Sequence, residues 1–73
     1  MGCILIEFGK NLKKVRKSNG FTQAELANDM GIEISQISRI ERGIINTSIN
    51  TAHQISKALM VDVSALFNFN QLT

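Results

Sequence analysis

The sequence predicts a small all-α protein that folds as a compact domain of five short helices. Apolar residues recur at helical spacing, glycine or short polar residues separate these segments, and no segment alternates in the manner of a strand. The chain has 73 residues, so residues 1–73 are expected to form a single domain. A domain of this size buries only about 60% of its unfolded surface, and dimerisation is a plausible way to extend its core.

The first predicted helix spans Ile4–Ser18 and is amphipathic. Its apolar face consists of Ile4, Leu5, Phe8, Leu12 and Val15. The opposite face carries Lys10, Lys13, Lys14 and Lys17 together with Ile6. Gly20 ends the helix, because glycine readily adopts the left-handed conformation of a C-terminal cap. The clustered lysines favour a polyanionic partner, although a solvated helix face is the more common explanation of charge alone.

The second and third predicted helices are short and lie close together in the sequence. Thr22 begins the second helix with a capping box, in which its hydroxyl accepts from the Glu25 amide and the Glu25 side chain reaches back. Gly31 ends this helix, and the third follows over Ile34–Arg42. Two short helices joined by a three-residue turn containing glycine have the spacing of a helix-turn-helix unit.

The fourth predicted helix runs from Ser48 to Leu59, and either Thr47 or Ser48 caps it. Its spacing predicts a core stripe made of Ile49, Ala52, Ile55, Ser56 and Leu59.

A fifth helix is expected over residues 63–68, with Asp62 as its cap. Leu66 and Phe67 are expected to close the core, and Met60 to fill it. Residues 69–73 are expected to form a loose tail.

The third helix has a polar face that suits the major groove of DNA. Ile37 and Ile40 fall on its core side. The opposite face carries Ser35, Ser38, Arg39 and Arg42. Arginine pairs well with guanine, and serine can donate or accept at a base edge. An ordinary exposed polar face gives the same helical wheel, so the wheel alone leaves both explanations open.

Glu41 leans toward the core side of the third helix, where a carboxylate needs a partner. Arg16 lies at the edge of the apolar face of the first helix, whereas the lysines point away. We therefore expect a structural ion pair between Arg16 and Glu41 that bridges the first and third helices.

Two segments carry a specific resemblance: Thr-Gln-Ala-Glu-Leu-Ala over residues 22–27 and Ile-Ser-Arg-Ile-Glu-Arg-Gly over residues 37–43. With Phe8-Gly9-Lys10 at one end and Leu66-Phe67 at the other, the matching residues cover about residues 8–67. The chain resembles the phage Cro and repressor proteins, often called the Xre-like helix-turn-helix family. This resemblance implies a five-helix domain of the lambda-repressor type that binds operator DNA as a two-fold dimer.

The resemblance also implies roles for single positions. Those expected to read bases are Glu33, Ile34, Ser35, Ser38 and Arg39. Those expected to contact the DNA backbone are Thr22, Gln23, Arg42, Asn46 and Thr47. Gln23 corresponds to a glutamine that contacts phosphate at a helix N-terminus, where the helix dipole also favours an anion. Arg16 and Glu41 match an interhelical ion pair of some members.

Several positions depart from the family pattern. Ile34 is apolar where several phage members have glutamine, so it could touch a thymine methyl. Glu33 could accept from cytosine or simply repel a phosphate. Thr47 replaces a common proline, which leaves its loop less rigid. Ile44 and Ile45 are apolar where polar residues are common: either they form an interface, or one of them packs under the fourth helix.

The sequence argues against an enzyme, a metal protein and a membrane protein. His53 and Cys3 are the sole histidine and cysteine, and no nucleophile relay or glycine-rich phosphate loop is present. No apolar run approaches the ~20 residues of a membrane span. We expect no metal, cofactor or small-molecule ligand, and a location in the bacterial or phage-infected cytoplasm at the nucleoid.

The predicted function is sequence-specific binding of double-stranded DNA by a homodimeric transcriptional regulator. Since the domain takes up nearly the whole chain, the protein is expected to be complete and to resemble the controllers of restriction–modification systems or small phage regulators. The alternative is an antitoxin that binds a toxin and regulates its own operon. The expected dimer surface contains Val61, Val63, Phe67 and Phe69.

Overall fold

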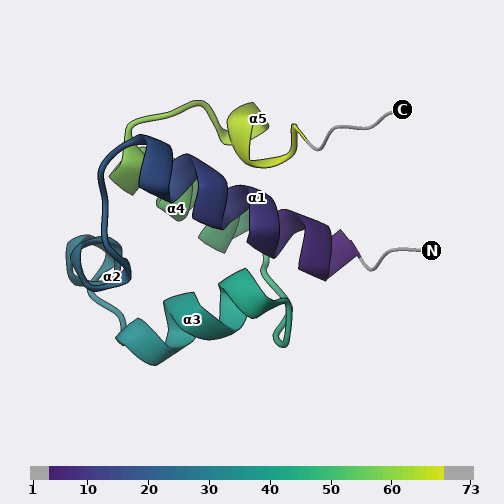
Figure 1. Ribbon diagram of the computed structural model, residues 1–73, viewed down its shortest axis with the longest axis horizontal. Helices are drawn as coiled ribbons and strands as arrows, with labels where there is room; N and C mark the ends of the chain where they lie inside the picture. The colour runs from purple at the N-terminus through teal and green to yellow at the C-terminus, as the bar shows by residue number, and fades with distance from the viewer. Residues whose placement is uncertain (1–3, 69–73) are drawn as a thin grey trace.

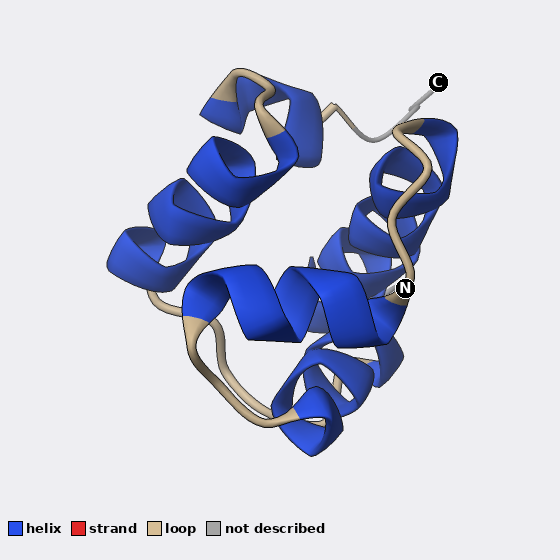
Figure 2. Ribbon diagram, turned by 90° about the vertical axis from the view of Figure 1, so that its left-hand side faces the viewer, coloured by secondary structure: helices blue, strands red, loops and turns tan. Residues whose placement is uncertain are grey.

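The computed structural model describes residues 4–68 and confirms the all-α prediction. The five helices of this part of the chain are α1 (Ile4–Ser18), α2 (Gln23–Met30), α3 (Ile34–Arg42), α4 (Ile49–Leu59) and α5 (Val63–Leu66). Loops join them, and residues 4–68 contain no strand (Figure 2).

The helices pack around one small core. The longest helix, α1, packs against α3 and α5, while α2 packs against α3 and α4 (Figure 1). Every helix contributes to the fully buried side chains, which are Leu12, Leu26, Ile37, Ile55, Leu59 and Leu66. The pair α2 and α3 therefore lies on a support formed by α1 and α4, which fixes how α3 is presented to solvent.

Local chemistry sets the ends of the central helices. Thr22 Oγ1 accepts from the Glu25 amide at 3.0 Å, and Glu25 Oε1 accepts from the Thr22 amide at 2.9 Å, which is the predicted capping box. Gly31 ends α2 with φ 70°, in the left-handed region that favours glycine. Ser48, not Thr47, caps α4, since its hydroxyl accepts from the Thr51 amide at 3.0 Å.

Three residues expected in the core are instead exposed. Ile4 is 61% exposed, Ile49 84% and Met60 87%. Ile4 and Ile49 are the first residues of their helices, so each has helical neighbours on one side only. Met60 caps the end of α4 with φ 61°, and at this cap the chain leaves the helix. Helical spacing predicted Ile4 and Ile49 as buried, and the apolar side chain of Met60 predicted it as a core filler; these three expectations are wrong.

The α5 helix is shorter than expected and ends at Leu66. Asp62 occupies its cap position, but its side chain makes no capping hydrogen bond. Leu66 is fully buried, as predicted, whereas Phe67 is 48% exposed and lies against Phe8 with ring centroids 5.1 Å apart. The expectation that Phe67 closes the core is therefore only half met, because one side of its ring faces solvent.

Asn11 of α1 fastens α5 to the rest of the domain. Its side-chain amide donates to the carbonyl oxygens of Ala65 and Leu66 at 2.9 and 2.7 Å. A helix of one turn has few internal hydrogen bonds, so these two bonds satisfy carbonyls that the helix itself leaves open. Nothing in the sequence pattern of α1 signalled this role.

Candidate nucleic-acid interface

The outer face of α3 presents the polar side chains that the sequence placed there. Ser35, Arg39 and Arg42 are exposed and Ser38 is half-buried. On the inner face, Ile37 and Ile40 belong to the core. Arg42 Nε lies 3.4 Å from the carbonyl oxygen of Ser38, one turn earlier. The helix thus offers two guanidinium groups and two hydroxyls on one side while its isoleucines anchor the other.

Two further predicted base-reading residues lie where α3 begins. Glu33 is the N-cap residue and is exposed, and its side chain makes no capping hydrogen bond. Ile34 is the first residue of the helix and is 49% exposed. Both side chains are thus available at the end of α3 that faces the turn from α2.

Arg16 and Glu41 form a buried ion pair between α1 and α3. Arg16 Nε donates to Glu41 Oε2 at 2.6 Å and Arg16 Nη2 donates to Glu41 Oε1 at 3.2 Å. The two side chains are 7% and 3% exposed. Arg16 Nη1 also donates to the carbonyl oxygen of Phe21 at 2.7 Å, which holds the α1–α2 loop. This forked geometry satisfies both charges inside the protein, as a buried pair requires.

Gln23 extends this network to the start of α2. Its Nε2 donates to Glu41 Oε1 at 2.9 Å, so the Glu41 carboxylate accepts from both Arg16 and Gln23. The first residue of α2 is therefore tied to the last turn of α3. From the family resemblance, Gln23 was expected to contact the DNA backbone, and its bond to Glu41 was not predicted. The available signal was a glutamine at the helix start together with an inward-leaning Glu41.

The remaining candidate backbone contacts lie around the helix ends. Thr22 is exposed, and its hydroxyl oxygen accepts the capping bond. Asn46 is exposed and Thr47 half-buried in the loop after α3. In the same loop, Ile45 packs against the core and Ile44 is 58% exposed. Ile45 thus packs inward, as one of the two alternatives expected, while Ile44 faces solvent.

The predicted dimer residues differ in exposure. Val61 and Val63 are half-buried and pack against the core, so they offer little free surface. Phe67 is exposed at the end of α5. Phe69 lies outside the described residues.

Over residues 4–68, neither a metal site nor a membrane span is present. These residues contain no cluster of three or more His, Cys, Asp or Glu side chains that could hold a metal ion. None of the helices between residues 4 and 68 is long and apolar enough to cross a membrane.

Comparison with known proteins agrees with this geometry. The sequence model of the helix-turn-helix family matches residues 12–66, which spans α2 and α3 and most of the core. The chain belongs to the helix-turn-helix family. The resemblance seen in the segments 22–27 and 37–43 is thereby confirmed at the level of the family.

Two relatives indicate the range of this family. Antitoxin HipB of Escherichia coli O6:H1 is 40% identical over 53 residues, which cover 73% of this chain and 56% of HipB. The HTH-type transcriptional regulator SinR of Bacillus licheniformis is 38% identical over 61 residues, which cover 82% of this chain and 55% of SinR. The chain therefore spans little more than half the length of these two relatives.

A solved structure of similar size has the same fold. The restriction-modification controller protein C.AhdI from Aeromonas hydrophila superposes with a TM-score of 0.82 at 32% sequence identity. The match covers 86% of this chain and 96% of C.AhdI. The five-helix domain is thus an arrangement found in a controller protein of comparable extent.

Proposed function

We propose that this protein is a transcriptional regulator that binds double-stranded DNA with α3 in the major groove. The observation that carries the proposal is the outer face of α3, where Ser35, Arg39 and Arg42 are exposed while Ile37 and Ile40 are buried. A helix of this kind fits the major groove, and its arginines suit guanine or phosphate. The similarity to SinR and C.AhdI supports the same function.

The proposed site divides into base-reading and backbone-binding residues. Glu33, Ile34, Ser35, Ser38 and Arg39 would face base edges. Thr22, Gln23, Arg42, Asn46 and Thr47 would face phosphates. Gln23 has a second amide hydrogen beyond the one donated to Glu41, and it sits at the positive end of the α2 dipole. Such a helix start is a favourable place for a phosphate.

We further propose that the protein works as a homodimer on a pseudo-palindromic operator. Dimeric helix-turn-helix proteins contact two half-sites that lie one turn of the DNA helix apart. Phe67, exposed at the end of α5, is the described residue best placed among those predicted at the interface. Such a regulator would act at the bacterial nucleoid, without catalysis and without a small-molecule ligand.

Selection of bound sequences from random DNA tests this proposal. We expect an enriched two-fold motif, and we expect affinity for it to fall steeply as salt increases because bound Lys and Arg release counterions from DNA. Affinity can be measured by fluorescence anisotropy from 50 to 200 mM salt, where about six phosphate contacts would give a loss near 10³-fold. No enrichment together with a flat salt response would contradict DNA binding.

The similarity to HipB favours a second candidate function, that of an antitoxin that binds a toxin and regulates its own operon. The identity of the neighbouring gene distinguishes an antitoxin from a stand-alone regulator. A small toxin encoded beside this chain, and held by it in a purified complex, would favour the antitoxin. A neighbouring methyltransferase or nuclease gene would favour a controller.

A further inference from the structure

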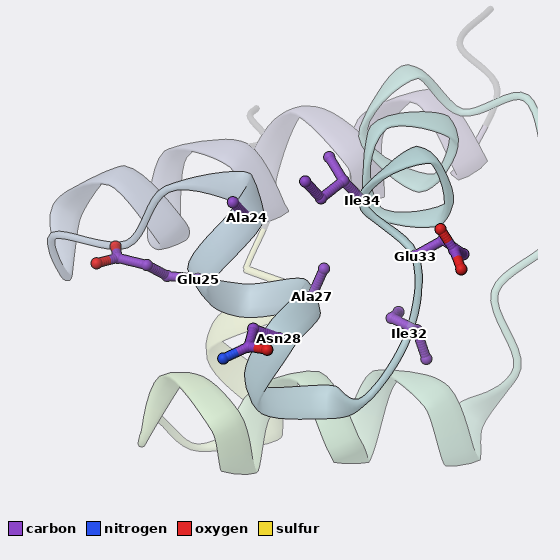
Figure 3. A pocket seen from close by; sticks show the side chains of 7 residues that line it. All are labelled: Ala24, Glu25, Ala27, Asn28, Ile32, Glu33 and Ile34. Carbon is purple, nitrogen blue, oxygen red and sulfur yellow. The ribbon is translucent and has the colours of Figure 1, made fainter.

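A shallow hollow of about 500 Å³ lies between α2 and the start of α3, beside the proposed base-reading residues. Ala24 and Ile34 face one another across it, and Ala27 lies below them in the view of Figure 3. Ala27 is buried and forms the floor, whereas Ala24 and Ile34 are exposed at the rim. The alanine side chains of α2 are short, which leaves this space open.

The charges around the hollow are unfavourable to a phosphate. Its polar lining consists of Glu25, Asn28 and Glu33, and its described lining residues include no lysine or arginine. Glu25 and Glu33 lie on opposite sides of the apolar surface (Figure 3). Two carboxylates repel the charged phosphates of the DNA backbone far more than a base edge, which carries no net charge. Because Ile34 is the first residue of α3, the hollow is expected to face a base edge if α3 enters the major groove.

The apolar part of the hollow favours one base. Ile34 has no hydrogen-bonding group in its side chain, and Ala24 and Ala27 add only methyl groups. Among the four bases, thymine alone presents an apolar group in the major groove, the methyl on C5. We propose that Ile34, together with Ala24 and Ala27, forms a site for a thymine methyl group and makes thymine the preferred base opposite the start of α3. This inference rests on the proposed DNA-binding function.

Replacing thymine by deoxyuridine tests the site, because this change removes the methyl group and leaves the hydrogen-bonding edge intact. In the selected operator, each thymine of one half-site is replaced in turn and affinity is measured at fixed salt. At one position, the replacement should lower the affinity of the protein for the operator about fourfold. This is the effect expected from no longer burying one methyl group. Changing the matching thymine in both half-sites should cost about 15-fold.

Variants of the protein test whether the hollow contacts the thymine at that position of the operator. We compare the affinity for the operator with thymine at that position and the affinity for the operator with deoxyuridine there. Ile34→Ala should bring the ratio of these two affinities close to one, because it removes the exposed apolar side chain. Ala24→Leu should do the same from the other side by filling the hollow. Both residues are exposed, so both variants should fold, which thermal unfolding can verify. Ile44→Ala is the matched control: it removes an exposed isoleucine outside the hollow and should leave the ratio at about fourfold.

The outcomes separate this inference from the proposed function. If the protein selects an operator but no thymine responds to deoxyuridine, the methyl site is wrong and DNA binding stands. The inference is also overturned if the ratio persists in both Ile34→Ala and Ala24→Leu. If no sequence is selected at all, the proposed function fails first, and the methyl site fails with it.

Discussion

At the scale of single residues, the Glu41 carboxylate joins three parts of the fold. It accepts from Arg16 of α1 and from Gln23 of α2, while it belongs to the last turn of α3. The two helices of the proposed DNA site are thus fixed to each other through one buried anion. A change at Glu41 should disturb folding first and DNA binding as a consequence.

Glu41→Ala should destabilise the protein by about 3–5 kcal/mol, because it leaves the Arg16 guanidinium buried without its partner. A domain of this length has a total stability of only about 4–11 kcal/mol, so the variant should be largely unfolded at modest urea concentrations. Glu33→Ala is the control, since Glu33 is exposed near the other end of α3. It should change stability by less than about 0.5 kcal/mol. Similar urea midpoints for the two variants would show that the ion pair contributes little.

At the scale of the helices, the sequence was sufficient to predict helix ends where the interaction joins residues close together in the chain. The Thr22 capping box and the left-handed Gly31 depend on neighbours a few residues away, so both ends of α2 could be predicted from the sequence. The contacts of Asn11 and Gly9 join segments far apart in the chain. Their spacing in α1 is that of ordinary helix positions, so no local pattern could reveal them.

Ile34 shows the same division within the candidate site. The predicted bounds of the third helix placed Ile34 at its start, and the family resemblance implied that it reads a base. The hollow beside it depends on how α2 packs against α3, which brings Ala24 opposite Ile34. Likewise, Gln23 was predicted as a backbone contact, but its bond to Glu41 follows from the packing of α2 on α3.

Gly9 allows α1 to approach α3 closely, and Gly9→Ala should separate the two helices. A Cβ atom there would lie 2.6 Å from the carbonyl oxygen of Ile40 and closer still to that of Glu41, and a backbone cannot move aside as a flexible side chain can. We expect a loss of about 1–3 kcal/mol, although alanine is the better helix former. Lys10→Ala, on the exposed side of the same helix, should leave the urea midpoint nearly unchanged. A stabilised Gly9→Ala variant would refute the close approach.

At the scale of the whole molecule, the dimensions of the chain are compatible with the spacing expected of a two-fold operator. The chain extends 34 × 22 × 20 Å, so two copies in contact would have centres separated by about its own width or length. Recognition helices of such dimers lie about 34 Å apart, one turn of DNA. The proposed dimer therefore needs no extended linker to reach both half-sites.

Insertion of DNA between the half-sites tests this arrangement. Adding about 5 base pairs at the centre of the selected operator moves one half-site to the opposite face of the helix. A contacting dimer cannot then engage both halves, so affinity should fall toward that of a single half-site. A central substitution of equal length, without insertion, serves as the control and should have a much smaller effect. If the inserted operator binds as tightly as the original, and sedimentation shows a monomer bound to each half-site, the protomers act independently and the dimer proposal is wrong.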